Sequence, residues 1–247
     1  MTVISVDLAY KQYSDIGVAL LDVVEGGIRC AFHSVSLVAE PDANHLAEYL
    51  TTLCAKQKAD ILLIDGPQGW KHPDNGLTHS RVCERALNTP AKTGLPEIVK
   101  PANYAPFVRF SVKVFDHLIQ RGWTLFSGMA DHNGKRTLIE SFPLSAWNSL
   151  KIPSLPAKSK AKQADIENRL AEIQHRFPLT CAGAPRHDDL QALVSGLAGV
   201  AIEMGMENCV TMAGRSPEML EGRWREGFIV NPASPVDWLS ILPNRAL

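Results

Sequence analysis

The stretch ADILLIDGP, residues 59–67, places four consecutive aliphatic residues between two aspartates and then ends in glycine and proline. An apolar run of this length is typical of a short strand buried on both faces, and the Gly66-Pro67 pair predicts its end. Asp65 therefore occupies the last position of a buried strand. A carboxylate beside an apolar core is costly unless something compensates its charge, so we treat Asp65 as a candidate functional residue.

The residues before this stretch predict a meander of strands. The apolar runs Val3–Ala9, Ile16–Val24 and Ile28–Val38 are separated by short polar turns, which favours antiparallel pairing. A helix over Ala43–Lys56 then leads into the buried strand. A meander followed by a strand–helix–strand unit predicts an α/β fold whose mixed sheet has helices on both faces.

The stretch after Asp65 contains no convincing long element. Residues 66–103 hold five prolines and one short candidate helix, Ser80–Leu87. A connection of this length inside a compact domain is usually functional or mobile. We therefore expect residues 66–103 to form an excursion beside an active site.

The second half of the chain predicts three helices and two strands. The expected helices are Tyr104–Gln120, Ala164–Phe177 and His187–Met204, and the expected strands are Trp123–Met129 and Arg136–Ser141, around a turn at Asp131–Gly134. Pro143–Gln163 is expected to be a loop. Without an internal repeat or a dividing linker, we expect residues 1–247 to form one domain, with residues 208–247 as a C-terminal extension packed on the core.

Composition narrows the class of protein. Lys plus Arg number 25 and Asp plus Glu 26, so the net charge of −1 excludes a uniformly basic nucleic-acid coat but not a local basic patch. Five cysteines without a CxxC pair argue against a disulfide framework or a zinc knuckle. The start has no basic leader, and the longest apolar stretch is too short for a bilayer. We expect a cytoplasmic protein that does not bind membranes; its oligomeric state stays open.

Three positions bring carboxylates next to the predicted core. Asp7 lies late in the first strand, Asp65 ends the buried strand, and Asp188 and Asp189 begin the most apolar helix. The ordinary interpretation of each is a turn residue or a helix cap. Together they would repel each other, and a divalent cation, Mg²⁺ or Mn²⁺ for oxygen ligands, is the usual remedy. Such ions can activate water and stabilise the leaving oxygen of a phosphodiester.

This order of acids resembles the ribonuclease H-like superfamily and, in detail, the domain-of-unknown-function 429 family, whose members are described as predicted nucleases. The matching segments are Val6–Ala9, Ile64–Pro67 with the later Arg81–Arg85, Ile139–Pro143 and His187–Leu193. The resemblance implies a mixed five-stranded sheet flanked by helices, with a long insertion after the fourth strand. It also implies a nuclease that depends on Mg²⁺ or Mn²⁺ and acts on nucleic acid.

The resemblance also implies roles for individual residues. Asp7, Asp65 and Asp188 would be catalytic and would hold the metal. Glu140, in a Glu-x-x-Pro pattern, would be a further catalytic acid acting as ligand or base. Arg81 and Arg85 would bind the substrate's phosphate, since arginine grips phosphate in a bidentate manner. The ordinary alternative for these arginines is a salt-bridged short helix.

One position departs from the pattern of related resolvases. Those enzymes carry a second acid three residues after the helix aspartate, and here that residue is Gln191. Glutamine is neutral and a poorer ligand, which puts a second metal ion in doubt. Asp189 lies about 100° further round the helix and replaces it only if the helix starts irregularly.

A basic loop is a second candidate for substrate binding. No acid occurs between Ser141 and Ala164, whereas four lysines do. Phosphate backbones favour such a patch, so Lys158 and Lys160 are candidate nucleic-acid contacts. The ordinary alternative is a solvated loop.

Two other functions compete with a nuclease. A sugar-kinase-like enzyme needs a glycine-rich phosphate turn after its first-strand aspartate, and Asp7-Leu8-Ala9-Tyr10-Lys11 has no glycine. A non-catalytic protein that binds nucleic acid or nucleotide through a degraded site remains open, because Gln191 and the near-zero net charge agree with it. Whether the substrate is DNA, RNA or a small nucleotide also stays open.

Overall fold

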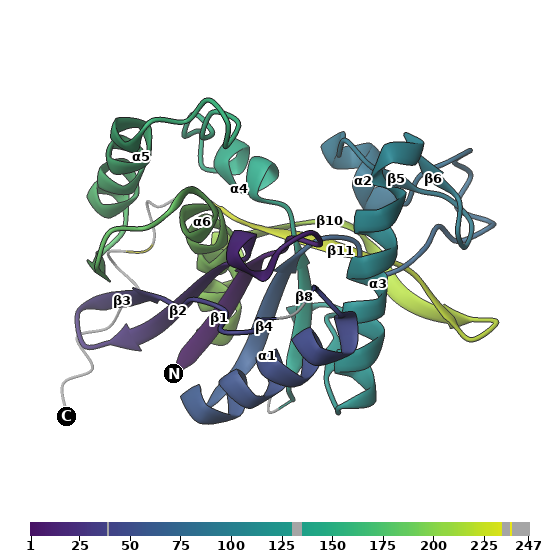
Figure 1. Ribbon diagram of the computed structural model, residues 1–247, viewed down its shortest axis with the longest axis horizontal. Helices are drawn as coiled ribbons and strands as arrows, with labels where there is room; N and C mark the ends of the chain where they lie inside the picture. Colours follow the sequence, from purple (N-terminus) through teal and green to yellow (C-terminus); the bar gives the residue numbers. More distant parts are fainter. Residues whose placement is uncertain (39, 130–134, 234–237, 239–247) are drawn as a thin grey trace.

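A mixed β-sheet forms the centre of the molecule (Figure 1). The computed structural model describes residues 1–38, 40–129, 135–233 and 238. The antiparallel meander consists of β1 (Thr2–Asp7), β2 (Gly17–Val24) and β3 (Gly27–Phe32). On the other side of β1, β4 (Ala59–Asp65) and then β8 (Thr137–Ser141) add in parallel. The expected α/β fold with a mixed sheet is confirmed.

The sheet is wider than the five strands that we expected. Within the described residues it has nine strands: β9 (Leu179–Ala182) pairs with β3, and β11 (Arg223–Pro232) joins β8, followed by β10 (Val210–Leu220). A short strand, β7 (Thr124–Leu125), also pairs with β8. The additional strands lie towards the edges, where a strand needs no continuous apolar run.

Helices cover both faces of the sheet. On one face, α1 (Ala43–Gln57) and α3 (Ala105–Gln120) bury their apolar stripes against Ile4, Val6 and Leu62. On the other face, α6 (His187–Glu203) packs on residues from the alternate positions of the same strands, including Val3, Leu63 and Ile139. This alternation means that side chains of odd-numbered residues in β1 and β4 face α6.

Two smaller helices complete the α6 face. They are α4 (Pro143–Ser149) and α5 (Gln163–Arg176). The expectation of a loop over Pro143–Gln163 was wrong at its start, because Pro143 stands at the first position of α4, where proline has no hydrogen bond to lose. Trp147 of α4 is fully buried in the core beneath α6.

The excursion after β4 is ordered by the C-terminal ribbon. It contains α2 (Val82–Leu87), β5 (Lys92–Thr93), β6 (Val99–Lys100) and the 3₁₀ turn η2 (Ala102–Tyr104). Trp70 pairs with β11: its N–H donates to Trp224 O (2.9 Å), and its carbonyl accepts from Glu226 N (2.7 Å). The excursion and β11 therefore form one connected structure.

The end of the described chain returns to the core. Trp238 is fully buried and packs edge-on against Phe177, with ring centroids 5.1 Å apart. The expected turn at Asp131–Gly134 and most of residues 234–247 lie outside the described residues. No helix in the described part of the chain is long and apolar enough to cross a membrane.

Candidate functional site

Asp7 and Asp65 lie side by side at the carboxyl ends of β1 and β4. Val6 and Ile64 are in register across this parallel pair, and each aspartate follows one residue later. Both residues are half-buried, and their carboxyl groups are within hydrogen-bonding reach of each other. The meeting of the two strand-end acids expected from the sequence is therefore present.

The two carboxyl groups hold their protons more tightly than free aspartates do. Burial raises the pKa of Asp7 well above its ordinary value, and the charges of Asp65 and Asp188 raise it further. Burial also raises the pKa of Asp65, to about 7, although the hydrogen bond with Asp7 acts in the opposite direction. Near neutral pH the pair therefore carries less than two negative charges.

Asp188 approaches this pair from the start of α6. It is the second residue of the helix, and its charge is one of those that raise the pKa of Asp7. The close approach depends on Gly17 of β2, which is in register with Asp7. A Cβ at Gly17 would stand 2.1 Å from the carbonyl oxygen of Asp188, closer than any side chain permits.

The carboxylate of Asp188 is bound by two basic groups. Lys158 Nζ donates to Asp188 Oδ2 at 2.5 Å and also to Asp15 Oδ1 at 2.9 Å. His187 Nδ1 lies 3.0 Å from Asp188 Oδ1, and its Nε2 donates to the carbonyl of Pro156 at 3.0 Å. Burial acts to raise the pKa of Asp188, but the hydrogen bonds from His187 and Lys158 outweigh it and lower that pKa. The hydrogen bond to Asp188 in turn raises the pKa of His187.

Asp189 has a structural position and does not join the acids. Its Oδ2 accepts from the backbone N–H of Arg186 (3.0 Å) and its Oδ1 from Arg186 Nη2 (2.8 Å), which caps the helix. Arg186 also donates to the carbonyls of Ser14 and Ile16. The start of α6 is regular, so Asp189 does not replace the missing acid at Gln191.

Gln191 is held by a buried tryptophan. Trp147 Nε1 donates to Gln191 Oε1 at 2.6 Å. The side chain at the position where resolvases carry an acid is therefore committed to a contact with α4. This agrees with the doubt about a second metal ion.

Glu140 is held in a buried ion pair, although its charge helps to raise the pKa of Asp65 and the two residues line the same pocket. Asp65 is in register with Ser141, and Glu140 therefore points to the other face of β8. Arg81 donates to both of its oxygens, each at 2.6 Å, and the backbone N–H of Gln68 donates to Oε2 at 3.0 Å. Burial raises the pKa of Glu140, and the contacts with Arg81 and Gln68 oppose the rise. Both oxygens expected to serve a metal or a water are thus occupied.

Arg81 is buried, contrary to what a phosphate contact at the surface requires. Only 1% of it is exposed, and besides Glu140 it binds Glu84 through Nε (3.0 Å). Glu84 in turn accepts from the backbone N–H and the hydroxyl of Thr93. These contacts fix the excursion to β8, and this arrangement does not favour the predicted phosphate contact of Arg81.

Arg85 and Lys160, the other expected substrate contacts, are exposed. Arg85 lies in the last turn of α2, and Lys160 lies in the loop before α5. Their positions are compatible with contacts to a polyanion, and their roles stay predictions. Lys158, by contrast, reaches the acids directly.

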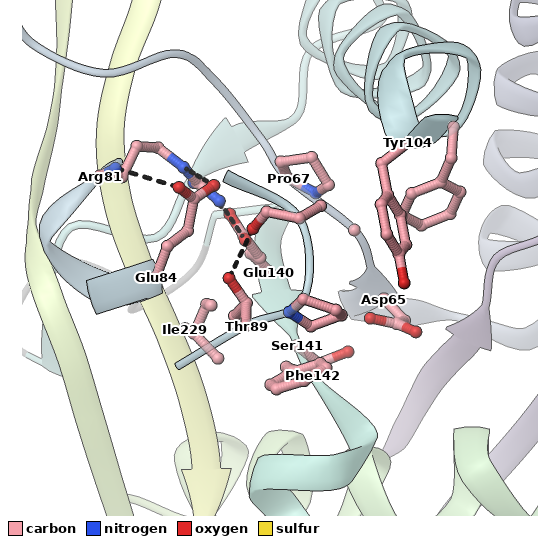
Figure 2. Close-up of a pocket in the computed structure, with 14 residues that line it drawn as sticks. Asp65, Pro67, Arg81, Glu84, Thr89, Tyr104, Glu140, Ser141, Phe142 and Ile229 are labelled. Carbon is pink, nitrogen blue, oxygen red and sulfur yellow. Dashed lines mark hydrogen bonds and ion pairs between the residues drawn. The ribbon is translucent and has the colours of Figure 1, made fainter. Parts of the chain in front are cut away.

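A pocket opens beside Asp65, between the excursion and β8 (Figure 2). Its volume is about 200 Å³. Asp65 and Tyr104 lie at one side of it, and Arg81 with Glu84 at the opposite side. The remaining lining is mostly apolar and consists of Gly66, Pro67, Thr89, Pro90, Ala91, Phe107, Glu140, Ser141, Phe142 and Ile229.

A divalent cation needs several oxygen donors around one point. Among the described residues, no group of three or more His, Cys, Asp or Glu side chains is arranged to hold a metal ion. Asp7 and Asp65 alone offer adjacent oxygens, and their raised pKa values show the cost of placing two uncompensated carboxylates together. Asp7 and Asp65 would thus supply two of the oxygens that one hard cation needs, and Asp188 would add a third only without its contact to Lys158.

Some residues that shape this region carry no recognisable sequence signal. Glu226 binds three segments of the excursion: it accepts from His72 N (3.0 Å), Asn75 Nδ2 (2.6 Å) and Val82 N (2.8 Å). It lies between Arg225 and Gly227 in β11, and no motif in the sequence marks it. Gly17, as the glycine that opens a strand, is the one such residue whose type hints at a close approach.

Comparisons with known proteins found one weak structural similarity. No family model and no curated protein matches the sequence. Among solved structures, RuvC from Thermus thermophilus is similar, with 13% identity and a TM-score of 0.41, over 83% of this chain and 98% of that one. A likeness of this degree supports no conclusion about activity, and membership of the domain-of-unknown-function 429 family stays a prediction.

Proposed function

We propose that the protein is a divalent-metal-dependent nuclease, or a related phosphodiester hydrolase, that acts on nucleic acid. The observation that carries the proposal is the adjacency of Asp7 and Asp65 at the ends of two parallel strands, with Asp188 facing Asp7 from α6. Paired carboxylates whose pKa values are raised by burial and mutual repulsion are the arrangement that a cation relieves.

The topology supports a ribonuclease H-like fold. Three antiparallel strands are followed by a helix and two strands parallel to the first, in the order β3-β2-β1-β4-β8. The first acid lies on β1, the second on β4 and the third on a late helix that packs on the sheet. This is the order of strands and acids that the resemblance implies.

Asp7 and Asp65 would hold Mg²⁺ or Mn²⁺, and Asp188 would complete the site. The bound ion would supply an activated water and would stabilise the leaving oxygen of a phosphodiester. The carboxyl pair must release its protons first, so its affinity for metal increases with pH.

Lys158 and His187 would control the position of the Asp188 carboxylate before substrate binds. Half of the Lys158 side chain is exposed, and its ammonium bridges Asp15 and Asp188 across the open side of the site. An arriving phosphate attracts the same ammonium, so Lys158 can leave Asp188 for the substrate. His187 is fixed by its hydrogen bond to Pro156 and keeps the Asp188 carboxylate oriented.

A non-catalytic protein that binds nucleic acid or nucleotide is the second candidate. Two observations favour it: Asp188 is already neutralised by Lys158 and His187, and Gln191 is bound to Trp147. A lysine that stays on Asp188 would leave the site with two acids.

Calorimetric titration with Mn²⁺ and Mg²⁺, beside hydrolysis of labelled single- and double-stranded DNA and RNA, tests the proposal. We expect binding by the wild type, loss of binding and hydrolysis in Asp7→Asn and Asp65→Asn, and no change in Asp60→Asn. Asp60 is the matched control, an exposed aspartate at the other end of β4. Metal binding with no hydrolysis of any substrate would favour the second candidate. No metal binding, with or without nucleic acid, would refute the metal site.

A further inference from the structure

The pocket beside Asp65 has the walls of a site for a flat ring. Tyr104 and Phe107 line it from the start of α3, Phe142 lines it from the end of β8, and Pro67 and Pro90 add apolar edges. Its volume of about 200 Å³ is below the roughly 300–1,000 Å³ typical of drug-sized ligands. It therefore suits one small ring system and not an extended chain.

The proximity of these aromatic rings to the acids has a structural cause. Gly66 follows Asp65 directly, with φ at +146°. A Cβ there would lie 2.4 Å from Ser111 Oγ and 3.3 Å from Phe107 Cζ. The absence of a side chain at Gly66 thus lets α3 bring Phe107 next to the end of β4.

The pocket also contains a polar group that can form a hydrogen bond with the edge of a bound ring. Ser141 is 1% exposed, and its hydroxyl has no hydrogen-bond partner among the described residues. A buried hydroxyl without a partner is unfavourable, and a ligand that hydrogen-bonds it would remove that cost. The Arg81–Glu140 ion pair in the same lining is already satisfied internally, so the Ser141 hydroxyl is the polar group offered to a ligand.

From this geometry we propose that the pocket binds one unpaired nucleobase, next to a phosphate that a cation on Asp7 and Asp65 would hold. The proposal deepens the function proposed above and rests on it for the position of the phosphate. An aromatic cavity with a polar floor, directly beside a carboxylate pair suited to a cation, matches a ligand that combines a flat heterocycle with a phosphate. A nucleotide is such a ligand.

Protein residues next to the pocket also suit a nucleotide ligand. Phe107 also contacts Tyr10, with ring centroids 6.3 Å apart, and Tyr10 lies three residues after Asp7. Tyr10 lines a second, open groove, in which the basic residues Arg109, Lys113 and Arg223 lie beside the acidic residues Asp42 and Asp116. Aromatic surfaces and cations in sequence are what single strands bind. Since a base must leave its stack to enter a pocket, the proposal predicts a preference for unpaired nucleic acid or free nucleotide over duplex.

Fluorescence of 2-aminopurine tests the pocket, because this base loses emission when it stacks on an aromatic ring. The probes are 2-aminopurine riboside, its monophosphate, a single-stranded oligonucleotide with one 2-aminopurine, and its duplex, all in EDTA so that nothing is hydrolysed. We expect quenching with the single strand or the free nucleotide and little with the duplex. A comparison of the monophosphate with the oligonucleotide shows which of the two supplies the base.

Three variants locate the base. Tyr104→Ala removes a wall and Ala91→Phe fills the cavity, and each should weaken binding of the quenched base about tenfold, since stacking on one ring contributes about 1–3 kcal/mol. Leu95→Ala is the matched control, because Leu95 belongs to the same excursion and is exposed but lines neither the pocket nor the open groove. Thermal melting checks that each variant is folded.

The possible outcomes separate the two proposals. Quenching that both pocket variants abolish and Leu95→Ala preserves supports the base pocket. Oligonucleotide binding by anisotropy, with hydrolysis but with quenching absent or equal in all variants, overturns the pocket and leaves the nuclease standing. Pocket-dependent quenching without metal binding or hydrolysis refutes the nuclease and supports a base-binding protein. No quenching by any probe overturns the pocket.

Discussion

Gly17 of β2 touches the backbone of Asp188 at the start of α6. A Cβ on Gly17 would lie 2.1 Å from the Asp188 carbonyl oxygen and 2.6 Å from the Asp189 nitrogen. The missing side chain therefore sets how far the first turn of α6 descends towards the end of β1. The position of Asp188 therefore depends on Gly17, which has no side chain that could take part in a reaction.

Gly17→Ala should separate Asp188 from Asp7. We expect α6 to shift outward at its start, which weakens Mn²⁺ binding at least tenfold. Calorimetry checks this, with Val24→Ala as the control, because Val24 is exposed at the other end of β2. Unchanged Mn²⁺ affinity would mean that Asp188 is not a ligand.

Asp65→Asn should stabilise the metal-free protein at high pH. The folded-state pKa of Asp65, about 7, lies above the ordinary value of 3.8. Its contribution to stability is therefore complete below pH 4 and is lost as the pH rises through 7. We expect the Asp65→Asn variant to melt a few degrees above wild type at pH 8 in EDTA, since about 1 kcal/mol corresponds to 2–4 °C at this size, and to melt at the same temperature at pH 4.

Added Mn²⁺ provides the internal check on that result. The wild type should gain stability at pH 8, because a ligand that binds only the folded state raises the free energy of unfolding, whereas Asp65→Asn should gain none. A variant less stable than wild type at pH 8 in EDTA would show that Asp65 is structural.

Lys158→Met should increase metal affinity. It removes the ammonium that occupies Asp188 Oδ2 while keeping the length of the side chain. We expect Mn²⁺ to bind about tenfold more tightly, which corresponds to about 1.4 kcal/mol, and nucleic acid to bind less tightly at low salt. Lys160→Met, on the same loop but exposed, is the control. Weaker Mn²⁺ binding in Lys158→Met would instead show that the lysine holds the site together.

Glu140→Gln should act mainly on stability. It leaves Arg81 buried with one carboxylate in place of two, and breaking a buried ion pair costs about 3–5 kcal/mol. Urea unfolding measures the loss, and Arg85→Ala, an exposed arginine on the neighbouring helix, should change the free energy of unfolding by less than about 0.5 kcal/mol. If Glu140→Gln keeps full stability and loses only metal binding, Glu140 belongs to the catalytic acids as the sequence suggested.

Gln191→Glu should keep the hydrogen bond from Trp147 and add a charge on the face of α6 that carries Asp188. We expect stronger Mn²⁺ binding, followed by calorimetry. Gln191→Leu leaves the Trp147 N–H buried without a partner and should cost about 1–3 kcal/mol of stability in urea unfolding. Equal Mn²⁺ affinity in Gln191→Glu and wild type would place this position outside the metal site.

The strand-end acids were predictable because their signals are local. An apolar run that ends in aspartate predicts a strand with the acid at its carboxyl end. The carboxyl ends of parallel neighbouring strands meet at one edge of the sheet, so such acids lie close together. Asp7 and Asp65 met these conditions. Asp188 followed from the start of an apolar helix, although its two basic partners did not.

Glu140 shows what local signals leave out. We expected it at the end of a strand facing the acids, and it does line the pocket with Asp65, but its buried partners Arg81 and Gln68 come from a distant segment and have no local signal. The ribbon β10–β11 was not predicted either. β10 is mostly exposed or half-buried, so it lacks the apolar alternation by which a strand is recognised.

Because Glu226 binds the excursion, the parts of the site form in a definite order during synthesis. His72, Asn75 and Val82 leave the ribosome long before Glu226 does, and β11 is also the strand that pairs with the outer edge of β8. A nascent chain can assemble the meander, β4 and β8 early, and Arg81 then holds the excursion to β8 through Glu140. His72, Asn75 and Val82 gain their contacts to Glu226 only when β11 arrives, so a chain cut short ahead of residue 223 would keep the acids and the aromatic walls but would lose Ile229 and this second anchor.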